Sequence, residues 1–98
     1  MEEKLLFRLL TPAKEVTSCR CDAVNLFEKE SLLGSGGGSI GIHRGHLPAV
    51  IALAEGGPLQ VLTQGKTVFA AQVRGGFARV NRESVTVLTP SAEVTVES

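Results

Sequence analysis

The chain is interrupted by glycine, proline and other turn-forming residues at intervals of roughly eight to twelve residues, a spacing typical of β-sandwiches and β-barrels. The dipeptides Thr11-Pro12, Gly56-Gly57 and Gly75-Gly76 mark three of these corners. The segments between corners are short and rich in Val, Leu and Thr, and no window of about 11 residues has a helical period. The sequence therefore predicts an all-β fold built from short strands.

The positions of the strands follow from apolar runs and from the alternation of apolar and polar residues. Residues 15–28 alternate with a change of phase, which predicts either two strands or one strand bent by a β-bulge. Segments 64–66 and 81–84 are predicted hairpin turns, and the Gly-rich segment 34–39 is a predicted flexible loop. The remaining predicted strands cover residues 5–10, 40–42, 49–54, 59–63, 67–73, 77–80, 85–88 and 94–96.

Length and charge limit the classes of function. With 98 residues the chain is predicted to form one domain, 1–98. Its ten basic and ten acidic residues cancel, which argues against binding nucleic acid through bulk charge. Four Phe without Trp or Tyr offer no stacking platform for bases. No segment is long and apolar enough to span a membrane, and the first ten residues lack the features of a signal peptide. A cytoplasmic location is therefore expected.

Catalytic and nucleotide-binding motifs are poorly represented. Segment 34–39 contains no Lys, which a phosphate-binding Walker loop needs, and it precedes a short strand rather than a helix. The only histidines available as general bases are His43 and His46, and there is no G-x-S-x-G nucleophile elbow. These observations predict a protein that is not an enzyme, binds no cofactor and acts through protein partners.

Two cysteines and two histidines keep a metal site open as an alternative. Cys19 and Cys21 are predicted to lie on the same face of a strand, and His43 and His46 follow later in the chain. Four nitrogen and sulfur ligands could form a tetrahedral zinc site, which would make the chain a small metal-binding β-module. The other interpretation is two buried or half-buried cysteines and two histidines on an exposed turn.

Four motifs then occur in an order that is characteristic of one family. A strand and a T-P turn occupy residues 7–16, and the run G-S-I-G-I-H-R-G-H-L-P-A occupies residues 38–49. A glycine corner, R-G-G-F-A-R-V, covers residues 74–80, and S-V-T-V-L covers residues 84–88. In this order they resemble the N-terminal β-sandwich domain of the epsilon subunit of the F-type ATP synthase, called delta in mitochondria, over roughly residues 4–92.

This resemblance implies a ten-strand β-sandwich and a non-catalytic rotor subunit of the central stalk. In that family the domain packs against the gamma subunit and touches the c-ring, so that rotation driven by protons or sodium ions is coupled to ATP synthesis. The resemblance also implies a peripheral position on the cytoplasmic face of a bacterial membrane. The partner-binding residues that it implies are Thr11 and Ile51 toward gamma, and Ser39, Arg44, Gly45 and His46 in the loop that faces these partners.

The sequence departs from the family pattern at four places. Ser39 stands where an acidic residue is usual, and Arg44 stands where proline is usual. The loop at residues 30–38 is longer than usual. The chain also stops at Ser98, where most bacterial members continue into a C-terminal helical hairpin, so the hairpin is expected to be absent.

Overall fold

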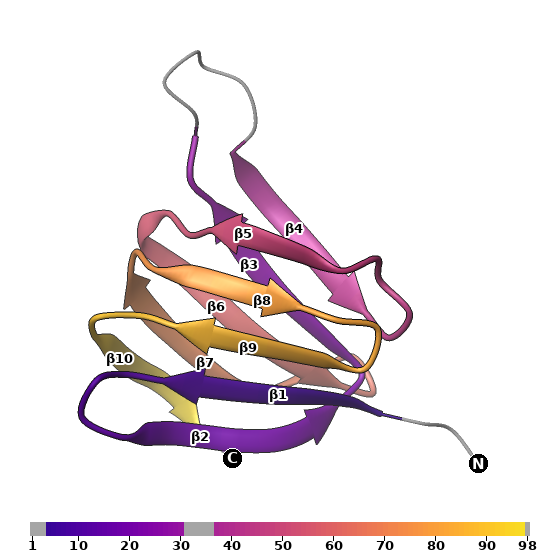
Figure 1. Cartoon of the computed structure of the whole chain (residues 1–98). Coiled ribbons are helices and arrows are strands. Elements are labelled where there is room, and N and C mark those ends of the chain that lie inside the picture. The colour runs from indigo at the N-terminus through magenta and orange to yellow at the C-terminus, as the bar shows by residue number, and fades with distance from the viewer. Residues whose placement is uncertain (1–3, 31–36, 98) are drawn as a thin grey trace.

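The computed structural model describes residues 4–30 and 37–97, which form ten strands in two packed sheets of five (Figure 1). This confirms the predicted all-β sandwich. The first sheet has the order β2-β1-β9-β8-β5, and all its neighbours are antiparallel except β1 and β9, which are parallel. Its strands are β1 (Leu5–Leu10), β2 (Glu15–Cys21), β5 (Ala49–Ala52), β8 (Phe77–Val80) and β9 (Ser84–Leu88).

The second sheet lies behind the first in Figure 1 and is antiparallel throughout, with the order β10-β7-β6-β3-β4. Its strands are β3 (Ala23–Glu28), β4 (Gly38–His43), β6 (Glu55–Thr63), β7 (Lys66–Arg74) and β10 (Ala92–Glu97). The chain therefore passes between the two sheets several times. In this way short strands that follow one another in the sequence enclose a common core between the sheets.

The core forms where the inward faces of the two sheets meet. In β1 the residues alternate strictly, so that Leu5, Phe7 and Leu9 are fully buried while their neighbours face outward. The ring of Phe7 lies across the sandwich from the ring of Phe69 in β7, with centroids 6.1 Å apart and planes tilted by 43°. Burying a side chain of this size contributes about 1.5–3 kcal/mol. This contact therefore helps to hold the two sheets together.

The change of phase predicted within residues 15–28 marks the passage from one sheet to the other. Cys21 ends β2 and Ala23 begins β3, with Asp22 alone between them. Cys21 and Val24 are both buried, although they are three residues apart, because the chain crosses between the sheets at this point. The two-strand alternative is confirmed, and the single bulged strand is wrong.

Two predicted boundaries are wrong for identifiable reasons. The corner predicted at residues 55–58 belongs to β6, where Gly56 has φ 75° and the pairing with β7 shifts between Glu55 and Gly57. Pro58 is tolerated because β3 pairs with β6 only further along the strand, which leaves one side of β6 free here. Segment 34–39 is not all loop, since β4 already begins at Gly38; residues 34–36 of that predicted loop lie outside the described part of the chain.

Candidate partner-binding surface

Three of the predicted partner-binding residues form a tight turn between β4 and β5. The backbone N–H of His46 donates to the carbonyl of His43 at 3.2 Å, and Gly45 at the third position has φ 91°. A positive φ at this position defines the turn class that favours proline at the second position, which Arg44 occupies here. The N–H of Gly45 also donates to the carbonyl of Arg82 at 2.7 Å, which fixes the turn against the β8–β9 hairpin.

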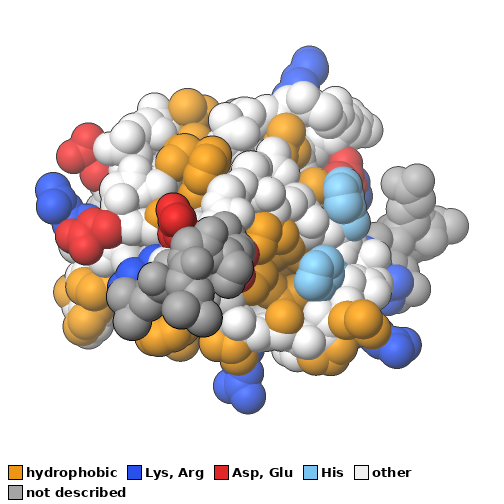
Figure 2. Space-filling model, turned by 90° about the horizontal axis from the view of Figure 1, so that it is seen from above, with side chains coloured by type: hydrophobic (Ala, Val, Ile, Leu, Met, Phe, Trp, Pro, Cys, Tyr) orange, Lys and Arg blue, Asp and Glu red, His pale blue; other side chains and the backbone are white. Residues whose placement is uncertain are grey.

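Side-chain contacts add to this arrangement. Arg44 Nη2 lies 3.5 Å from Glu83 Oε1, an exposed ion pair of small energetic value. His46 Nδ1 lies 2.7 Å from the carbonyl oxygen of Leu47, and because a carbonyl oxygen can only accept, this ring nitrogen carries the hydrogen that makes the bond. Figure 2 shows the two histidines, in pale blue, beside hydrophobic side chains on the face seen from above.

Thr11 lies at the opposite end of the first sheet from this turn. β1 and β9 both run from the end that carries the turn toward the end that carries Thr11, at the left of Figure 1. The backbone N–H of Thr11 donates to the carbonyl of Lys14 at 2.9 Å and closes the β1–β2 corner. Thr11 also lines a shallow, almost wholly apolar groove of about 440 Å³, together with Leu10, Pro12, Gly76, Phe77, Leu88, Thr89 and Pro90.

An exposed apolar patch forms the floor of this groove. Leu88 of β9 pairs with Leu10 of β1 on one side and with Phe77 of β8 on the other, so these three side chains form a row across the outer face of the sheet. Phe77 is 55% exposed and Leu88 is 49% exposed. Large apolar side chains that are exposed singly need no explanation, whereas a contiguous group beside a groove is typical of a protein-binding surface. We call Leu10, Phe77, Leu88 and Pro90 the apolar patch.

The other two predicted residues lie apart from the apolar patch. Ile51, expected to face gamma, points into the core and is only 6% exposed; the outward residue of β5 is its neighbour Val50, which is 69% exposed. Ser39 is exposed near the start of β4, where it pairs with Phe27 of β3. It therefore lies at the far end of β4 from the turn that carries His46. The predicted residues form at least two separate surfaces.

The four residues of the alternative metal site do not come together. Within residues 4–30 and 37–97, no group of three or more His, Cys, Asp or Glu side chains is placed to hold a metal ion. Cys21 is buried and its thiol approaches the carbonyl oxygen of Leu5 at 3.6 Å. Burial, followed by the neighbouring Cys19, raises the pKa of the Cys21 thiol to about 11. The placement of these four side chains therefore does not support the metal-binding alternative.

The comparison with protein families decides the identity of the fold. The family model for the β-sandwich domain of the ATP synthase delta/epsilon chain matches residues 4–95. The chain belongs to the ATP synthase delta/epsilon family. The match includes all ten strands up to the middle of β10, so it covers the turn at His43–His46 as well as the apolar patch.

Individual relatives agree with this assignment. The chain is similar to the ATP synthase epsilon chain of Paramagnetospirillum magneticum, with 35% identity over 99% of this chain and 70% of that protein. It is 32% identical to the epsilon chain of Frankia casuarinae over 89% of this chain and 93% of that protein. For the epsilon chain of Nitratidesulfovibrio vulgaris the identity is 40%, over 95% of this chain and 63% of that protein.

Solved structures show the same fold. A chain in the Euglena gracilis mitochondrial ATP synthase, in a structure of its OSCP, F1 and c-ring, superimposes with a TM-score of 0.77 and 25% identity, covering 96% of this chain and 55% of that one. A chain in the central stalk and c-ring of the Tetrahymena thermophila mitochondrial ATP synthase gives a TM-score of 0.67 at 17% identity, over 93% of this chain and 66% of that one. The described residues include no helix that is long and apolar enough to cross a membrane.

Sequence reasoning did not identify the apolar patch. In the segment F-A-R-V, alternation places Phe77 on the same face of its strand as Arg79, and in S-V-T-V-L it places Leu88 on the same face as Thr86. Alternation does not show that these two strand faces lie on the same side of one sheet. The polar partners Arg79 and Thr86 were the available signal, because a polar residue two positions away from a large apolar residue indicates an outward face. The pairing register then brings the two apolar residues together.

Proposed function

We propose that this chain is a non-catalytic rotor subunit of the central stalk of an F-type ATP synthase, and that it helps to couple rotation of the c-ring, through gamma, to ATP synthesis. Membership of the delta/epsilon family and the match to bacterial epsilon chains support this role. The role places the chain at the periphery of the cytoplasmic face of the membrane, within a complex driven by protons or sodium ions. The partners would be the gamma subunit and the c-ring.

The observation that carries the proposal is the exposed apolar patch next to Thr11. Phe77 and Leu88 each expose about half of their surface. Covering such a surface removes it from water, which stabilises a complex by roughly 25 cal/mol for each Å² of apolar area. We assign this surface to the gamma subunit, with Thr11 at its edge.

The turn at His43–His46 is assigned to the second partner, the c-ring. It lies at the other end of β1, β8 and β9 from the apolar patch, so the two contacts are separated by the length of the first sheet (Figure 1). Close-packed protein interiors have low compressibility and transmit strain. A sandwich with a continuous core between two contact surfaces is therefore suited to passing force from one partner to the other.

Titration of this chain with the gamma subunit of the same organism tests the proposal. We expect Leu88→Asp to weaken binding by about tenfold or more, because it places a charge in the apolar contact. Val96→Asp is the matched control, since Val96 is exposed to a similar degree but lies on β10 of the second sheet. Failure of the unmodified chain to bind gamma would refute the proposed function, and equal losses in the two variants would remove the apolar patch from the interface.

A further inference from the structure

Charge is distributed unequally between the two sheets, although the whole chain is neutral. The strands of the first sheet carry three arginines and one glutamate, and they contain no lysine. The strands of the second sheet carry four glutamates against one lysine and one arginine. The first group is Arg8, Arg20, Arg79 and Glu15; the second is Glu28, Glu55, Glu93, Glu97, Lys66 and Arg74. The first sheet is thus the positive face of the sandwich.

Two of these arginines lie directly beside the apolar patch. Arg79 and Arg8 both pair with Thr86, one from β8 and one from β1, and so form a second row on the outer face. This row is two residues along the strands from the row of Phe77 and Leu88, a separation of about 7 Å. A surface that binds the apolar patch must therefore also contact the arginine row.

The two arginines differ in their contacts. Arg8 Nε donates to Glu15 Oε1 at 2.9 Å, so an acidic group of the chain already balances its charge. For Arg79, the part of the chain that the structure describes supplies neither an ion pair nor a side-chain hydrogen bond. Its neighbours on the same face are the exposed apolar residues Val50, across one strand pair, and Phe77, along the strand, with the polar Thr86 across the other strand pair. Arg79 is thus a cation beside exposed apolar side chains, with no charged partner among residues 4–30 and 37–97.

We propose that the partner of the apolar patch carries an acidic surface, in which carboxylates flank an apolar ridge and at least one of them binds Arg79. This inference rests on the proposed function and specifies the chemistry of the gamma surface. Arginine and aromatic residues are enriched in protein interfaces whereas lysine is depleted, which is the composition of this face. The planar guanidinium can also accept a carboxylate through two parallel hydrogen bonds.

Dehydration makes the carboxylate a requirement. When a partner covers Phe77, it also removes water from the neighbouring Arg79. A charged group that loses water without gaining an ionic partner destabilises the complex, so a partner surface without a carboxylate at this point is rejected. The apolar patch supplies affinity, and Arg79 selects which apolar surface is accepted.

The test compares charge variants in a titration with the gamma subunit of the same organism at low and at high salt. We expect Arg79→Glu to weaken binding about tenfold or more at low salt, with a smaller loss at high salt, since ions screen the repulsion. Arg79→Lys should bind with intermediate affinity because it keeps the charge but not the planar fork. Arg74→Glu, on the second sheet, is the matched control and should change the affinity by less than about twofold.

The outcomes separate the two proposals. If Leu88→Asp weakens binding and Arg79→Glu does not, gamma docks on the apolar patch and the acidic partner is refuted. If the unmodified chain does not bind gamma, the proposed function fails and the inference fails with it. Analytical ultracentrifugation covers the remaining case: a self-association that Arg79→Glu abolishes would show that the positive face binds the negative face of a second copy, which would also overturn the inference.

Discussion

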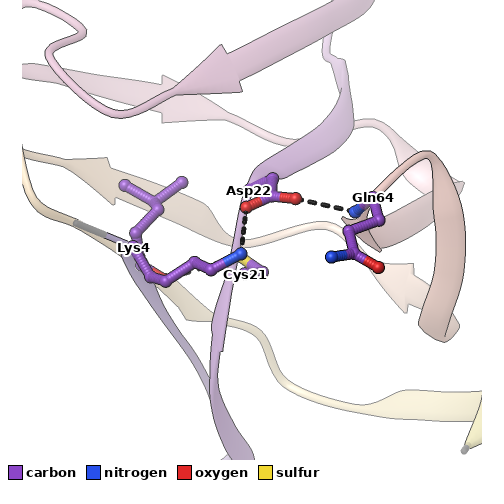
Figure 3. Close-up of polar contacts among 5 residues, drawn as sticks. Lys4, Cys21, Asp22 and Gln64 are labelled. Atoms are coloured by element: carbon purple, nitrogen blue, oxygen red, sulfur yellow. Dashed lines mark hydrogen bonds and ion pairs between the residues drawn. The ribbon is translucent and has the colours of Figure 1, made fainter. Parts of the chain in front are cut away.

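The carboxylate of Asp22 accepts a hydrogen bond of 2.7 Å from the backbone N–H of Gln64, a residue 42 positions away in the chain (Figure 3). The other carboxylate oxygen lies 2.6 Å from Lys4 Nζ. Asp22 is the residue at which the chain crosses between the sheets, Lys4 precedes β1, and Gln64 lies in the β6–β7 hairpin with φ 53°. One side chain thus joins three segments at the same end of the sandwich.

The contacts of Asp22 predict a dependence of stability on pH. Its ion-paired hydrogen bond with Lys4 and the bond from Gln64 hold the pKa of this carboxyl below its ordinary value. A carboxyl with a lowered pKa stabilises the fold above its unfolded-state pKa and loses that contribution as pH falls through the folded-state pKa. We expect Asp22→Asn to lower the urea midpoint at pH 7, with a difference from the unmodified chain that narrows below pH about 4. Glu93→Gln on β10 is the control, and a pH-independent difference would contradict the assignment.

The cysteines are expected to react slowly in the folded protein. Burial raises the pKa of both thiols, that of Cys21 to about 11, so few thiolates exist at pH 8. Mass spectrometry after brief treatment with iodoacetamide at pH 8 should find Cys19 modified before Cys21, because Cys19 is only half-buried. Both should react rapidly in urea. Equal rates for Cys21 in the folded and the unfolded chain would show that the β2 end is open.

Gly76 is predicted to tolerate no side chain. It has φ 101°, and a Cβ at this position would collide with the backbone of Leu88 and Thr89. Gly76→Ala should lower the free energy of unfolding by about 3 kcal/mol or more, which combines backbone strain with the collision. The control is Gly65→Ala, where φ is 75° but a Cβ meets nothing within 4 Å; strain alone should cost about 1–2 kcal/mol there. Similar losses in urea denaturation would refute the collision.

Replacing Arg44 by proline is expected to stabilise the chain. Arg44 occupies the second position of the turn closed by His46 N–H and His43 C=O, and His43 before it is extended, as a residue preceding proline requires. Relative to Arg44→Ala, Arg44→Pro should raise the free energy of unfolding by about 0.4–1 kcal/mol by restricting the unfolded chain. Both variants lose the ion pair with Glu83, so their difference isolates the turn. A less stable proline variant would show that the turn belongs to another class.

The sequence predicted the number and order of strands because most of them are short and bounded by turn residues. It could not predict the start of β6, because Gly56, Gly57 and Pro58 are corner residues in most contexts and are accommodated here only by a bulge and a free strand side. The residue types at 55–58 predicted the wrong start for β6, because the start of this strand depends on its pairing with β7 and β3.

The candidate surface was less predictable than the fold. The run A-V-I-A-L at residues 49–53 is apolar throughout, so its pattern does not tell which residues face the core. The pairing of Ile51 with buried Ala78 places it inside and exposes Val50 instead. The apolar patch likewise depends on the register between β1, β8 and β9, which joins residues distant in the sequence. The turn at Gly45 was predictable because its conformation is encoded locally.

The parallel pairing of β1 with β9 has a consequence for biosynthesis. Leu10 acquires its neighbour Leu88 only after β2 to β8 have been translated, so β1 lacks one of its two flanking strands while these strands emerge from the ribosome. Strands that wait for a distant partner expose apolar edges in the meantime. The nascent chain thus keeps an unpaired edge, open to aggregation, until β9 has left the exit tunnel.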